Sequence, residues 1–254
     1  MPIRFGSRIF DPRLFTTLLA VVLIAALVAL GRWQLRRADA KRALDDLFAS
    51  GADATRSIDR DTPPLSRYRH VEASGAYDAT RQVLIDNISN AQGRAGYYVI
   101  TPFALRGGGW ILVNRGWVPL GTSRADKPQI AVPAEPRELH GRVDELPRAG
   151  LQLGPRAVLA PPYPVVANFP TRDEIARLMH ESAWSHAADL VLLDPGEPDG
   201  YLRAWKPPGF PPMRHVAYAV QWFGLALTLA VIYVVTNLHR IPPPSAGPHA
   251  GSGQ

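Results

Sequence analysis

The sequence predicts a membrane protein in which two transmembrane α-helices flank one mostly antiparallel, β-rich (α+β) domain. Two uncharged apolar segments, one near each end of the chain, predict the helices, and short β-type runs between them predict the domain. The composition agrees, because 46% hydrophobic residues exclude a disordered chain and 25 Pro with 21 Gly exclude an all-helical bundle. The absence of Cys excludes disulfides, zinc–thiolate sites and thiol nucleophiles.

The first apolar segment runs from Leu14 to Gly31, after a short N-terminus at residues 1–13. At about 1.5 Å per residue it nearly spans a hydrocarbon core of about 30 Å, so we expect a transmembrane helix. The alternative is a cleaved signal peptide, but the segment exceeds the usual apolar length of about 7–15 residues and no A-x-A site follows it. No Ser-rich, Arg-rich transit peptide precedes it, which favours a bacterial plasma membrane over an organelle.

The first helix is expected to continue beyond the membrane to about residue 50, because no proline interrupts the chain before Gly51. The basic face of this extension is either a solvated face or a surface for a partner.

A β-rich domain is expected over residues 52–206. The runs that predict its strands are His70–Tyr77, Gln82–Ile88, Tyr97–Leu105, Trp110–Val118, Leu139–Leu146, Leu190–Leu193 and Tyr201–Trp205. The break at Gly107-Gly108-Gly109 predicts a hairpin between two of them. Thr171-Arg-Asp-Glu174 is a capping-box sequence and predicts one helix, with Ile175, Leu178 and Met179 on its apolar face.

The second apolar segment runs from Val216 to Leu238 and predicts the second transmembrane helix. Several prolines just before it predict a stiff joint with the β-rich domain. Residues 239–254 are expected to form a disordered cytoplasmic tail, because most of them are Pro, Gly and Ser.

The charge pattern leaves the orientation open. The net charge is +6, and more basic residues lie on the β-domain side of the two spans than on the side of the termini, which by itself favours a cytoplasmic β domain. That rule weakens for a loop as long as this one. Because many of the basic residues border the spans, they indicate contact with the lipid bilayer and give no reason to expect nucleic acid as a partner.

Most catalytic templates are missing from the sequence, including G-x-S-x-G, H-E-x-x-H and the phosphate-binding glycine motifs. His70, His140, His180 and His186 are scattered, and surface or core positions account for them without a metal.

One group of residues at the start of the second span remains as a candidate site. His215, Tyr218 and Trp222 fall within an arc of about 60° on a helix, and imidazole is a common axial ligand of heme iron. Arg32 and Arg214 are expected at the same depth, where they would pair with heme propionates. The alternative is an aromatic belt with a histidine at the membrane interface.

Asn114-Arg115-Gly116-Trp117 allows two interpretations. The first is a turn at a strand end, with Gly116 at positive φ and Trp117 in the core. The second is an edge that binds a partner.

Several segments together resemble the surfeit locus protein 1 family of cytochrome c oxidase assembly factors. They are Gly31-Arg-Trp-Gln-Leu-Arg-Arg37 with Lys41, Tyr68–Asp78, Gly96–Phe103, Val113–Pro119 and His215–Phe223. Val113-Asn-Arg-Gly-Trp-Val-Pro119 and the last segment are the most specific.

The resemblance implies a non-enzymatic assembly factor that binds heme a between its helices and assists its insertion into oxidase subunit I, with heme A synthase as a further candidate partner. It places the family's heme-associated histidine at His215, with Tyr218 and Trp222 as supporting candidates on geometry. It also implies a bacterial inner-membrane protein with both termini cytoplasmic and the central domain on the periplasmic side. A scaffold that holds an oxidase intermediate without touching heme is the alternative, and a membrane-anchored enzyme is a third reading.

Overall fold

The computed structural model describes residues 3–5, 8–50, 55–123, 126–148 and 158–240. The chain divides into two compact units, one made of residues 1–44 with 208–254 and the other of residues 45–207. The tail expected to be disordered over residues 239–254 begins with two residues that pair in a strand instead, His239 and Arg240, and its remainder lies outside the described residues.

Two long apolar helices dominate the first unit. Helix α1 is Leu14–Ser50 and helix α3 is Pro212–Thr236, and both are long and apolar enough to cross a membrane. The helix α3 starts earlier than the second apolar segment, because proline is tolerated in a first helical turn, where its missing N–H has no partner to lose. The strands β1 (Ile3–Phe5), β2 (Arg8–Phe10) and β11 (Leu238–Arg240) form a small antiparallel sheet in the order β1-β2-β11.

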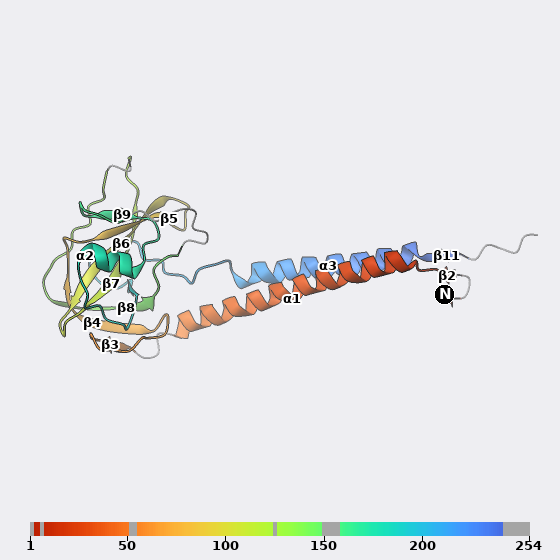
Figure 1. Cartoon of the computed structure of the whole chain (residues 1–254), viewed down its shortest axis with the longest axis horizontal. Helices are drawn as coiled ribbons and strands as arrows, with labels where there is room; N and C mark the ends of the chain where they lie inside the picture. The colour runs from red at the N-terminus through yellow and green to blue at the C-terminus, as the bar shows by residue number, and fades with distance from the viewer. Residues whose placement is uncertain (1–2, 6–7, 51–54, 124–125, 149–157, 241–254) are drawn as a thin grey trace, which may run out of the picture. The chain divides into compact units, whose positions relative to one another are not determined.

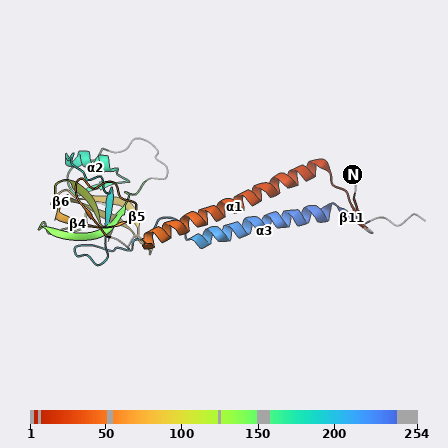
Figure 2. The ribbon, with the colours of Figure 1, turned by 90° about the horizontal axis from the view of Figure 1, so that it is seen from below.

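Small residues line the contact between α1 and α3, which run side by side in both views (Figure 1 and Figure 2). Ala20, Ala38, Ala219 and Ala226 are buried there. Gly31 is also buried, and a Cβ at this position would lie 2.6 Å from the ring of Phe223. Small residues leave room for large side chains of the facing helix, and at Gly31 the ring of Phe223 packs directly against the backbone of α1.

Replacing Gly31 with Val is expected to weaken the α1–α3 seam by about 1–3 kcal/mol, because the new side chain must displace the ring of Phe223. The measurement is SDS-induced unfolding in mixed micelles, followed by far-UV circular dichroism. Gly224→Val is the matched control, since a Cβ at Gly224 would meet no described atom within 4 Å. Equal midpoints for the two variants would contradict the proposed contact.

The second unit is an eight-stranded sheet with the order β3-β4-β8-β10-β7-β6-β5-β9. Its strands are β3 (Arg56–Ile58), β4 (His70–Tyr77), β5 (Val83–Ser89), β6 (Ala95–Leu105), β7 (Trp110–Pro119), β8 (Arg137–Asp144), β9 (Val165–Ala167) and β10 (Leu190–Leu193). An additional pairing of β4 with β6 closes β4, β8, β10, β7 and β6 into a ring. Three pairings are parallel (β3–β4, β5–β9 and β7–β10) and the others are antiparallel, so the expected class of fold is confirmed.

Side chains alternate along each strand, and this alternation determines which residues fill the interior of the ring. In β4 every second residue from Val71 is buried, and the residues between them are partly exposed. Apolar side chains from all five strands of the ring form one core cluster, which includes Val71, Phe103, Val113, Leu139 and Val191.

Helix α2 (Arg172–Met179) begins with the predicted capping box. The side chain of Thr171 accepts a bond from the N–H of Glu174, and the side chain of Glu174 accepts one from the N–H of Thr171. Ile175, Leu178 and Met179 are buried, as the apolar pattern predicts.

One expected strand is wrong. Residues 201–205 form no strand, and within them only Leu202 makes a bridge, to Trp117 of β7. Tyr201 and Leu202 bond to Arg115 and Trp117 of β7, but the pairing extends no further, and Trp205 donates its indole N–H to Leu193 O.

Candidate functional site

His215 lies in the first turn of α3 and is partly buried against α1. Its Nδ1 is 2.9 Å from Oε1 of Gln34, a residue of α1. With the amide in this orientation its oxygen can only accept, so Nδ1 donates to it and Nε2 is the ring nitrogen left for another partner. Metal-binding histidines usually have one ring nitrogen held in this way, so the arrangement fits an axial ligand for heme iron.

The two aromatic residues predicted beside His215 differ in their surroundings. Trp222 is partly buried on the face of α3 that contacts α1, whereas the Tyr218 side chain is 46% exposed. Ala219, at 1% exposure, occupies the seam next to Tyr218. The structure therefore brings His215 and Trp222 onto the contact face and leaves Tyr218 at its edge.

Arg32 and Arg214 are both exposed. The guanidinium of Arg214 lies 4.2 Å from the ring centroid of Phe210. Within the described parts of the chain, neither guanidinium makes a hydrogen bond or ion pair. Both are therefore available to bind carboxylates such as propionates.

The close contact of Gly31 with Phe223 leaves no space for a macrocycle between α1 and α3 at that level. His215 lies about two turns nearer the start of α3 than Phe223, so this contact does not close the space beside the imidazole.

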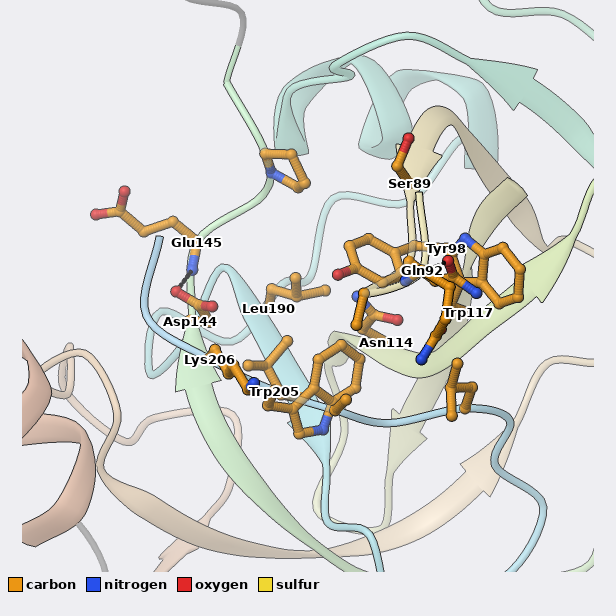
Figure 3. A pocket seen from close by; sticks show the side chains of 16 residues that line it. Ser89, Gln92, Tyr98, Asn114, Trp117, Asp144, Glu145, Leu190, Trp205 and Lys206 are labelled. Atoms are coloured by element: carbon orange, nitrogen blue, oxygen red, sulfur yellow. Dashed lines mark hydrogen bonds between the residues drawn. The ribbon is translucent and has the colours of Figure 1, made fainter. Parts of the chain in front are cut away.

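A cavity of about 380 Å³ lies in the β domain and was not predicted from the sequence (Figure 3). Most of its lining is aromatic and apolar, and Asp144, Glu145 and Lys206 are the charged residues among its walls. The residues that line it include Tyr98, Asn114, Trp117, Asp144, Glu145, Leu190, Leu192, Leu202, Trp205 and Lys206.

Polar contacts hold the walls of this cavity in place. Trp117 donates its indole N–H to Ile88 O at 3.0 Å, and Asn114 Oδ1 accepts the N–H of Gly116 at 3.0 Å. Burial raises the pKa of the Asp144 carboxyl above its usual range, although the guanidinium of Arg67 binds it. Asn114 and Trp117 belong to a segment that the sequence singled out, but the other walls come from distant segments.

Neither interpretation of Asn114-Arg115-Gly116-Trp117 holds as stated. The segment lies inside β7, which pairs with both β6 and β10, so it is neither a turn at a strand end nor a free edge. Gly116 does have a positive φ of +116°, and Trp117 is buried at 7% exposure.

Arg115 is 1% exposed and is the centre of a buried hydrogen-bond network. Its guanidinium donates to Asp199 O, Gln82 Oε1, Ile130 O and Ala131 O at 2.8–3.1 Å, and to Thr101 Oγ1 at 3.5 Å. Burial lowers the pKa of this guanidinium. Every one of these acceptors is a neutral oxygen, which assigns the residue a structural role.

Comparison with known proteins places this architecture in a family. The model of the SURF1 family matches residues 21–227, from within α1 to within α3. A SURF1-like protein of Rickettsia felis is 24% identical over 233 residues, covering 87% of this chain and 96% of that protein. A SURF1-like protein of Rickettsia conorii is 26% identical over 231 residues, covering 87% and 90%. Since the match takes in parts of both helices and the whole β domain between them, the chain belongs to the SURF1 family.

Proposed function

We propose that this protein is a non-enzymatic assembly factor for heme-copper cytochrome c oxidase that binds heme a and assists its insertion into subunit I. Membership of the SURF1 family is consistent with a role in cytochrome oxidase assembly, and the two apolar helices are consistent with a membrane protein. The support for heme binding, and for its site, comes from side chains of α1 and α3.

The observation that carries the heme proposal is the pairing of His215 with Gln34. The Gln34 amide oxygen accepts a hydrogen bond from Nδ1, which leaves Nε2 as the ring nitrogen that would bind iron. Arg32 and Arg214 would pair with the propionates, and Trp222 and Tyr218 would pack against the ring. Bound heme a supplies the iron porphyrin that the oxidase uses, and a single imidazole ligand suits cargo that must be released.

The orientation of the chain in the membrane is part of the same proposal. Heme delivery to subunit I fits a bacterial inner-membrane protein with both termini cytoplasmic and the β domain periplasmic. Heme A synthase is the proposed source of the heme.

Replacing His215 with Ala is expected to remove most of the bound heme a, because the variant loses its iron ligand. The measurement is the optical spectrum of detergent-purified protein coexpressed with the heme A pathway. Gln34→Leu is expected to lower the heme content about ten-fold, since it removes the partner that orients the imidazole. His239→Ala, in strand β11 just beyond the far end of α3, is the matched control and should keep its heme.

Two results would contradict this assignment in different ways. Heme retained in His215→Ala at equal protein yield would exclude His215 as a required ligand. No heme in the unaltered protein would favour the second candidate, a scaffold that stabilises an oxidase subunit intermediate. The contact of Gly31 with Phe223, which leaves no room for a macrocycle between the helices at that level, is the observation that favours that scaffold.

A further inference from the structure

Two glutamates and a histidine gather on the partly exposed side of strands β4 and β8. The two strands are antiparallel, with Glu72 directly opposite His140 and Glu138 opposite Ser74. Since side chains alternate along a strand, Glu138 and His140 point to the same side as Glu72, while their neighbours Val71 and Leu139 are buried. One ligand atom from each of the three residues lies within 4.8 Å of the other two.

The charge of this cluster is not balanced within the described residues. Neither Glu72 nor Glu138 makes a hydrogen bond or ion pair there, and a third carboxylate, Glu197, holds His140 Nδ1 at 2.8 Å. The nearest arginines on β8 are engaged elsewhere. Arg137 pairs with Asp199, and Arg142 lies 4.4 Å from the ring centroid of Phe48 and donates to Phe48 O.

We propose that Glu72, Glu138 and His140 bind a divalent transition-metal ion, with Zn²⁺ as the ion that this ligand set suits. Imidazole and carboxylate groups are the usual nitrogen and oxygen ligands of Zn²⁺, and the chain has no Cys to favour a softer ion. Glu197 supplies the carboxylate partner that orients a metal-binding imidazole, which leaves Nε2 for the ion.

The geometry needs only side-chain adjustment to close around the ion. Tetrahedral zinc sites with metal–ligand distances of about 2.0–2.1 Å place their ligand atoms about 3.3 Å apart, somewhat closer than in this cluster. Glu72 and His140 are partly exposed and Glu138 is exposed, so their side chains are free to rotate and water can complete the coordination. The paired strands β4 and β8 hold the three Cα positions in place.

The test is calorimetric titration of the metal-stripped, detergent-purified full chain with Zn²⁺. We expect about one equivalent to bind, and both Glu72→Gln and His140→Ala to weaken that binding at least about ten-fold. His186→Ala removes an exposed loop histidine and is the matched control, with an expected affinity equal to that of the unaltered protein.

Thermal unfolding distinguishes a variant that has lost the metal site from a variant that no longer folds. Glu72→Gln keeps the size of the side chain at a partly exposed position, so its unfolding temperature without metal should equal that of the unaltered protein. Added Zn²⁺ should raise the unfolding temperature of the unaltered protein and of His186→Ala, but not that of Glu72→Gln or His140→Ala. Failure of the unaltered protein to bind Zn²⁺, or equal binding by Glu72→Gln, would overturn the proposal without bearing on heme.

Discussion

Replacing Arg115 with Leu is expected to destabilise the β domain by about 4 kcal/mol, the largest loss that we predict for a single side chain. The guanidinium is 1% exposed and binds acceptors from segments that are far apart in the sequence. Leucine would leave Asp199 O and Ala131 O without the donor that the described residues give them. It would also take one of two donors from Gln82 Oε1, which keeps Thr101 Oγ1, and from Ile130 O, which keeps Gln82 Nε2. A buried acceptor without a partner costs about 1–3 kcal/mol, and here two acceptors lose their donor while two more lose one of two.

Urea unfolding of the full chain in detergent, followed by near-UV circular dichroism, measures this effect. Arg115→Lys is the matched variant, because it keeps the charge but not the planar fork of donors. It should recover less than half of the loss. Recovery of the full stability by Lys would show that charge, and not the network of directed bonds, is what the site requires.

Replacing Gly75 with Ala is expected to cost about 3 kcal/mol by opening the ring of strands. Gly75 is where β4 pairs with β8 on one side and with β6 on the other. A Cβ at this position would lie 2.0 Å from Ala104 O, which is backbone and cannot rotate away. The two strands must therefore separate at the point where the ring closes.

Hydrogen exchange of the β4 and β6 amides reports this opening directly, together with the midpoint of thermal unfolding. The control is Gly107→Ala in the β6–β7 turn, where a Cβ would meet no described atom within 4 Å. Protection of the β4–β6 amides at the level of Gly107→Ala would contradict closure of the ring at Gly75.

The strands that the sequence predicts well are those with a clear pattern. Strand β4 has the expected bounds His70–Tyr77 because its buried and exposed residues alternate without a break. Strand β10 has the expected bounds Leu190–Leu193 because a short apolar run is buried on both sides. Strands β3 and β9 were missed, since three residues are too few to show any period.

The candidate site is less predictable, because its contacts join segments that are distant in the sequence. The position of His215 in a helix was predictable, but its bond to Gln34 depends on how α3 packs against α1. The aromatic run at 201–205 indicates a strand by composition, yet Trp205 lines a cavity instead. Glu72 and His140 meet through the register of β4 on β8, which composition does not reveal.

The position of β10 in the ring determines when the β domain can complete its folding during translation. This strand lies between β7 and β8, although it follows both in the chain. While the ribosome is still synthesising the residues before Leu190, β7 and β8 have no partner for their facing edges, and unpaired edges attract strands of other chains. The β domain therefore completes its fold only when nearly all of it has been translated, shortly before α3 emerges. A chain that terminates before β10 is expected to aggregate and not to persist as a smaller folded domain.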